Sequence, residues 1–76
     1  MVQLEITLVG REKSFTAETL QECVEKFYDG YGEAEHEVVK CHTFEASDPS
    51  ESMSISGNKS CVAWLKQMKQ GVINEK

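Results

Sequence analysis

The sequence predicts an α+β domain, a two-layer sandwich in which two helices cover one face of a four-stranded, mostly antiparallel sheet (ββαββα). Three observations predict it: apolar residues alternate near the start of the chain, they recur every three or four positions in two later stretches, and strand-like stretches precede both of these. Neither a hairpin nor a lone amphipathic helix can bury its apolar face, whereas two helices packed on one sheet can. The 76 residues predict a single domain over residues 1–73 and a frayed tail at 74–76.

The first strand has the clearest pattern in the chain. Its apolar residues alternate with polar ones, which is typical of a half-buried strand, at Val2, Leu4, Ile6 and Leu8. Gly10 can adopt a positive φ angle, so we expect a short hairpin turn there. The chain then folds back as a short second strand over residues 13–15.

A helix is predicted over about residues 17–29. Its apolar stripe consists of Leu20, Cys23, Val24, Phe27 and Tyr31. Two helix starts compete: Thr16 as the N-cap with Phe15 packed on Leu20, or Thr19 with Glu22 as a capping box. Gly30 and Gly32 are expected to end the helix.

The second half of the chain repeats this order after a charged connector at residues 33–37. Residues 38–46 predict a strand with apolar residues on both faces: Val39 and Cys41 on one, Val38, His42 and Phe44 on the other. Residues 47–50 predict a turn, and alternating Met53 and Ile55 predict another half-buried strand. A second helix over about residues 59–70, ended by Gly71, has a stripe bordered by Trp64 and made of Cys61, Val62, Leu65 and Met68.

The charge of the chain is concentrated in its middle. Residues 18–51 contain ten acidic and two basic residues, a net charge of −8, whereas the whole chain carries −5. Such a segment repels a phosphate backbone, so direct nucleic-acid binding is not expected. It suits a protein partner with a basic surface, although modest acidity also serves solubility alone. No apolar run approaches the roughly 20 residues of a membrane-spanning helix, so no membrane is expected either.

The residue types that carry chemistry are not arranged for it. Cys41 and His42 are adjacent on a predicted strand, so their side chains point to opposite faces. The cysteines and histidines lack the close pairs typical of zinc sites, and no glycine-rich phosphate loop is present. We therefore expect no catalytic residues, metal or cofactor, and a protein that is not an enzyme. The odd, widely spaced set of Cys23, Cys41 and Cys61 favours a reducing, cytoplasmic location.

The strongest candidate for a binding surface is the end of the first helix and the connector after it. Two tyrosines rimmed by carboxylates resemble the hot spots of protein interfaces, although partial burial at the helix end also explains them. The predicted partner-binding residues are Glu25, Tyr28, Asp29, Tyr31, Glu33, Glu35 and Glu37.

Residues 17–20 (Ala-Glu-Thr-Leu), followed by Glu22, an aromatic residue near the helix end and Glu37-Val38-Val39, carry a family resemblance. Over residues 4–46 this strand–helix–strand arrangement resembles small phage-encoded inhibitors of host machinery, such as the RNA polymerase inhibitors of T7-like phages. Residues 50–71 lie outside it. In size and acidity the chain is also similar to anti-CRISPR and anti-restriction proteins. The resemblance implies an inhibitor of a host macromolecular machine, acting in the host cytoplasm.

An alternative function is a homo-oligomeric structural or assembly protein of a phage or mobile element. The strand at residues 38–44 has apolar residues on both faces, and the face that the helices do not cover needs another partner. A homodimer is therefore a possible state of the chain.

Overall fold

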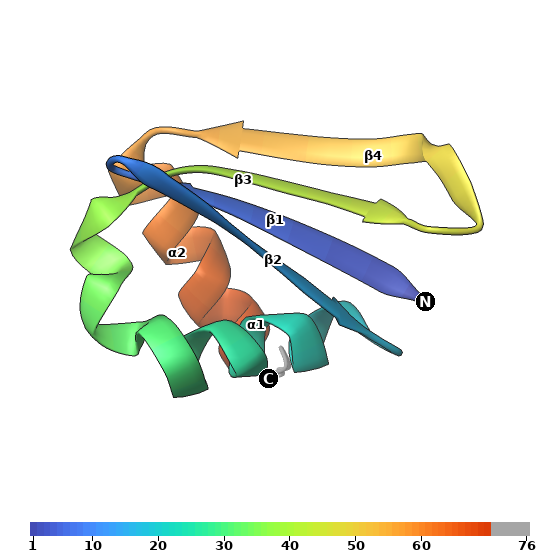
Figure 1. Ribbon diagram of the computed structural model, residues 1–76, viewed down its shortest axis with the longest axis horizontal. Helices are drawn as coiled ribbons and strands as arrows, with labels where there is room; N and C mark the ends of the chain where they lie inside the picture. Colours follow the sequence, from blue (N-terminus) through green and yellow to red (C-terminus); the bar gives the residue numbers. More distant parts are fainter. Residues whose placement is uncertain (71–76) are drawn as a thin grey trace.

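Four strands form one antiparallel sheet in the order β2-β1-β3-β4, in a computed structural model that describes residues 1–70 (Figure 1). Both helices lie on the same face of this sheet, with α1 against β1 and β2 and α2 against β3 and β4. The predicted fold class and the order ββαββα are confirmed. The elements are β1 (Val2–Leu8), β2 (Arg11–Ala17), α1 (Leu20–Tyr31), the 3₁₀ helix η1 (Gly32–Glu37), β3 (Val38–Glu45), β4 (Asp48–Ser56) and α2 (Asn58–Lys69).

Local sequence signals explain the turn of the first hairpin and the start of α1. Gly10 has a φ of 79°, as expected for the turn, but β2 spans seven residues and is longer than predicted. Thr19 is the N-cap of α1: its hydroxyl accepts from the Glu22 amide, and the Glu22 carboxylate accepts from the Thr19 amide, at 3.2 Å each. The capping box is therefore the start of the helix, and the alternative N-cap at Thr16 is wrong because Thr16 belongs to β2.

The end of α1 matches the prediction in part. Gly32 is the C-cap of α1, as expected, although it has right-handed helical angles (φ −56°, ψ −32°) rather than a positive φ, whereas Gly30 lies inside the helix. The chain continues from Gly32 as the 3₁₀ helix η1, which contains the charged connector predicted at residues 33–37. A Cβ atom at Gly32 would lie 3.6 Å from the Tyr28 ring, an ordinary van der Waals contact, so neither space nor φ requires glycine at this position.

A β-bulge decides which side chains of β3 are buried. Leu8 pairs with Val38 while Thr7 pairs with Lys40, so Val39 is the extra residue and is 41% exposed. Val38 and Cys41 consequently both reach the core. The prediction that Val39 shares the Cys41 face was wrong, because alternation does not continue through a bulge. The helix-covered face carries Cys41 and Thr43, which are both buried.

The second hairpin turns earlier than predicted. Ala46 and Ser47 form the turn, and β4 begins at Asp48, so residues 48–50 belong to a strand rather than to the expected turn. The register shifts between Phe44 and Glu45, which pair with Ser52 and Asp48. Because β4 lies at the edge of the sheet, its outward amides need no partner strand.

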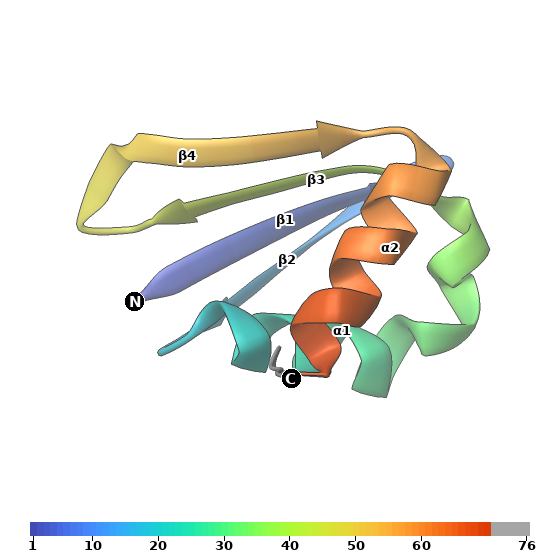
Figure 2. The same cartoon turned by 180° about the vertical axis from the view of Figure 1, so that it is seen from behind.

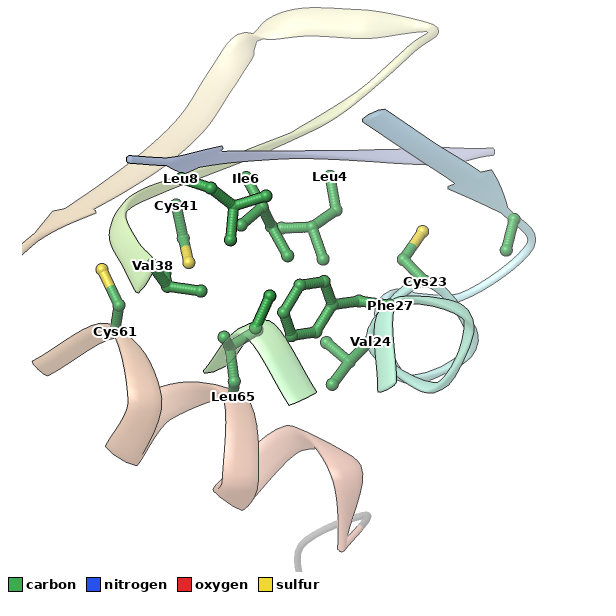
Figure 3. Packing of buried hydrophobic residues seen from close by; sticks show 12 residues of the cluster. Leu4, Ile6, Leu8, Cys23, Val24, Phe27, Val38, Cys41, Cys61 and Leu65 are labelled. Carbon is green, nitrogen blue, oxygen red and sulfur yellow. The ribbon is translucent and has the colours of Figure 1, made fainter. Parts of the chain in front are cut away.

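The core lies between the sheet and the two helices (Figure 3). Gly57, with a φ of 96°, turns the chain from β4 into α2, and Figure 2 shows the first turn of α2 beside η1. Gly71 and the predicted tail at 74–76 lie outside the described residues. The largest fully buried side chains come from both ββα units: Leu4, Ile6, Leu8, Cys23, Val24, Phe27, Val38, Cys41, Cys61 and Leu65.

Candidate protein-binding surface

The end of α1 and the start of η1 surround an open pocket of about 420 Å³. Four of the seven predicted partner-binding residues line it: Tyr28, Asp29, Tyr31 and Glu33. The remaining lining residues are Arg11 of β2, Gly30, Gly32 and Ala34. The structure therefore brings most of the predicted surface together around one hollow.

The two tyrosines flank the most deeply buried aromatic residue of the core. Phe27 is fully buried, and its ring centroid lies 5.2 Å from that of Tyr28 and 6.4 Å from that of Tyr31. Tyr31 also meets Phe15 of β2 edge to face at 5.9 Å. Both tyrosines are half-buried, which agrees with the alternative explanation of partial burial at the helix end, and both also line the pocket.

Tyr28 ties α1 to η1. Its hydroxyl donates to Glu35 Oε2 at 2.6 Å, and Glu35 Oε1 lies 3.9 Å from Lys66 Nζ of α2. Burial raises the pKa of Tyr28 far above its usual value, and the hydrogen bond to Glu35 raises it further. Tyr28 therefore stays protonated, and Glu35 is engaged inside the molecule rather than free for a partner.

Cations from distant segments come close to the acidic segment, and segment-by-segment charge counting missed them. Arg11 Nη2 lies 3.6 Å from Glu37 Oε1. Lys13 Nζ lies 5.3 Å from the centre of the Tyr31 ring, and Lys69 Nζ lies 4.6 Å from that of Tyr28, both within cation–π range. The net charge of −8 counted along the sequence is thus partly neutralised by β2 and α2.

The remaining carboxylates of the predicted set are exposed. Glu25, Asp29 and Glu33 form no ion pair within residues 1–70, and their side chains are open to solvent. Glu25 and Asp29 are four residues apart on α1 and so lie on the same side of the helix. Asp29 and Glu33 line the pocket. We call these three residues the acidic stripe.

The side chains with catalytic potential lie elsewhere. Cys41 is buried in the core, whereas His42 is on the uncovered face of the sheet, where its Nδ1 lies 3.3 Å from Glu5 Oε1. The two neighbours therefore do not meet, as alternation predicted. Burial, together with the neighbouring Cys61 thiol, raises the pKa of Cys41 to about 12, so this thiol carries no nucleophilic thiolate at neutral pH.

Residues 1–70 contain no group of three or more His, Cys, Asp or Glu side chains placed to hold a metal ion. No helix among them is long and apolar enough to cross a membrane.

No protein-family model, curated protein or solved structure matches this chain.

Proposed function

We propose that this protein is a small, non-enzymatic protein-binding module that binds a basic partner through the acidic stripe and the pocket beside it. Within that class, we propose an inhibitor of a host macromolecular machine, of the phage-encoded type that includes polymerase inhibitors and anti-CRISPR proteins, acting in the host cytoplasm. The observation that carries the proposal is the acidic stripe: three exposed carboxylates without an internal cation beside two half-exposed tyrosine rings.

The two parts of this surface supply different contributions to binding. The unpaired carboxylates raise the encounter rate with a basic partner, an effect that weakens as salt screens the charges. Tyrosine side chains, apolar along the ring and polar at the hydroxyl, are enriched among residues that dominate interface energies. Because Tyr28 and Tyr31 are already held by packing on Phe27, little side-chain entropy is lost when a partner covers them.

The inhibitor assignment is supported by the resemblance over residues 4–46 and by the small size and acidity of the chain. The placement of Cys41 and His42 on opposite faces of the sheet agrees with a function that needs no covalent chemistry.

The test is a charge reversal of the acidic stripe, with Glu25, Asp29 and Glu33 all changed to Lys. The immobilised variant and the wild type are each incubated with a bacterial lysate and with purified bacterial RNA polymerase. We expect the wild type to retain a defined basic protein or complex that the variant loses, and retention by the wild type to fall as salt increases.

A matched control makes the same change in net charge away from the pocket. The control changes three exposed acids of β2 and β4 to Lys, namely Glu12, Asp48 and Glu51. It should capture the same partner as the wild type. Identical capture by all three proteins, or capture that salt does not affect, would contradict the proposal.

A second candidate function, the homo-oligomeric assembly protein, rests on the face of the sheet that no helix covers (Figure 1). His42 and Phe44 are half-buried on this face, with ring centroids 5.3 Å apart, and β4 offers a free edge. The residues of β3 and β4 that pair with or beside them on this face are polar, namely Lys40, Ser52, Ser54 and Ser56. This polarity favours the first proposal. Sedimentation at micromolar concentration separates the two, because a clean monomer removes the second.

A further inference from the structure

We infer that the pocket at the end of α1 receives an arginine side chain of the partner. The inference rests on the proposed function and makes it specific, because it names the chemical group that the basic partner inserts. Three features of the structure support it: the volume of the pocket, the charged residues that line it, and the lysine ammonium groups that lie over its two tyrosine rings.

The volume and charge of the pocket suit one cationic side chain. At about 420 Å³ it lies toward the small end of ligand pockets. Asp29 and Glu33 line it, and neither forms an ion pair within the described part of the chain. Arg11 also lines it, but its guanidinium faces Glu37 at 3.6 Å, so its charge is offset. The pocket is therefore left with an excess of negative charge.

The aromatic walls already attract cations in the isolated molecule. Lys69 Nζ lies 4.6 Å from the centre of the Tyr28 ring, and Lys13 Nζ lies 5.3 Å from that of Tyr31. Both ammonium groups are at the ends of long side chains that do not themselves line the pocket. The Tyr31 ring thus offers a face on which a cation can be exchanged, with Lys13 moving into solvent when a partner arrives.

Arginine suits this exchange better than lysine. Its planar guanidinium stacks on aromatic rings, is less strongly hydrated than an ammonium group, and presents several donors in a fork that matches carboxylates. A guanidinium stacked on Tyr31 would have Asp29 and Glu33 available as acceptors. The inference therefore predicts that Lys13 competes with the ligand, although Lys13 is not itself part of the binding set.

The test uses the acetylated tripeptide glycyl-arginyl-glycinamide, added at up to about 10 mM to the ¹⁵N-labelled protein and followed by amide NMR shifts. We expect saturable shifts at Gly30, Gly32 and Glu33. The lysine peptide should bind more weakly, and the citrulline peptide, which has nearly the same shape but no charge, should not bind. Absent shifts at these amides, or equal shifts with citrulline, would overturn the inference.

Variants separate the pocket from the general charge of the protein. The double variant Asp29→Asn, Glu33→Gln should weaken peptide binding about tenfold, whereas Glu12→Gln, Glu51→Gln should leave it unchanged. Lys13→Ala should tighten binding, whereas Lys59→Ala, which removes the same charge at the start of α2, should not. Equal effects of the members of either pair would contradict the inference.

The inference and the proposed function can fail separately. If the arginine peptide binds the pocket but the immobilised protein captures no partner that charge reversal removes, the proposed function falls and the site stands. If a partner is captured through the acidic stripe but neither the arginine peptide nor the Asp29→Asn, Glu33→Gln variant has an effect, the inference alone falls.

Discussion

The Tyr28 hydroxyl donates to Glu35 Oε2 at 2.6 Å, and this bond joins the last full turn of α1 to the middle of η1. The same tyrosine lines the pocket, and Lys69 Nζ lies over its ring. One residue thus both holds the turn of the chain after α1 and shapes the candidate binding site. The hydroxyl serves the first role and the ring the second, so they can be separated by substitution.

Tyr28→Phe removes the hydroxyl and keeps the ring. We expect a loss of about 1.5 kcal/mol in the free energy of unfolding, because a half-buried bond to a charged acceptor is broken and Glu35 loses a donor. Urea unfolding should show a lower midpoint with an unchanged slope. The control is Tyr31→Phe, since the Tyr31 hydroxyl makes no hydrogen bond within residues 1–70, and its change should stay within about 0.5 kcal/mol. Equal losses in the two variants would contradict this role for the Tyr28 hydroxyl.

The pH dependence of stability provides a second test of Tyr28. Burial, and then the bond to Glu35, raises the pKa of Tyr28 above its unfolded value of 10.0, so the folded state holds this proton more tightly. The resulting stabilisation is fully present below about pH 10 and is lost as the pH rises toward the folded pKa. The stability difference between the wild type and Tyr28→Phe should therefore stay constant up to about pH 10 and narrow as the pH rises above it. Urea unfolding at each pH measures it, and a constant difference would contradict the assignment.

Thr19→Ala tests the start of α1. The variant removes the side chain that accepts from the Glu22 amide and should cost about 1 kcal/mol. Thr16→Ala is the matched control, because Thr16 lies in β2 and its side chain caps no helix. Its loss should be limited to a few tenths of a kcal/mol from lower strand propensity. Thermal unfolding followed by circular dichroism compares the two, and a larger loss at Thr16 would place the N-cap there instead.

These residues show how far the sequence predicts the fold. The capping box and the alternation of β1 depend on neighbours a few positions away, so the sequence contains their full cause. The bulge at Val39, in contrast, does not depend on residues close in sequence. It follows from the pairing of Leu8 with Val38 and of Thr7 with Lys40, a register set by two strands about 30 residues apart. Alternation within β3 alone could not reveal it.

The sequence likewise predicted the part of the candidate site that is local in the chain, but not the part that folding brings to it. Tyr28, Asp29, Tyr31 and Glu33 are close in sequence and were found together. Their cationic neighbours Arg11, Lys13, Lys66 and Lys69 belong to β2 and α2, and only folding brings them to the acidic segment. A signal existed in the predicted topology, since α2 packs beside α1, but the charge along the sequence concealed it.

Asn58 joins α2 to η1, and its role as a donor can be tested. Its Nδ2 lies 2.7 Å from the carbonyl oxygen of Val38, 3.2 Å from that of His36 and 3.3 Å from that of Glu35. Asn58→Asp keeps the shape and favours the N-terminal end of a helix, but replaces the donors with a carboxylate facing carbonyl oxygens.

If the donors matter, Asn58→Asp should lose about 2 kcal/mol and be no more stable than Asn58→Ala. If Asn58 acted only because it is favoured at the start of a helix, Asn58→Asp would be as stable as the wild type and only Asn58→Ala would be less stable. Denaturant unfolding of both variants gives the order, and amide exchange in η1 shows whether the contact with α2 has been lost.

The three cysteines should react only when the protein opens. Cys23 and Cys61 are fully buried and Cys41 is 2% exposed, while burial raises the pKa of both Cys23 and Cys41. Cys41 also lies beside Cys61, which raises its pKa further, to about 12 (Figure 3). Iodoacetamide at about pH 8 should therefore modify none of them at the rate of a free thiol. Mass spectrometry after timed exposure measures this, and all three should react at once in guanidinium. Because folding holds the Cys41 proton more tightly than the unfolded chain does, its contribution to stability is lost as the pH rises from about 9 toward 12. Rapid modification of Cys41 in the native protein, while unfolding remains slow, would show that this part of the core opens locally.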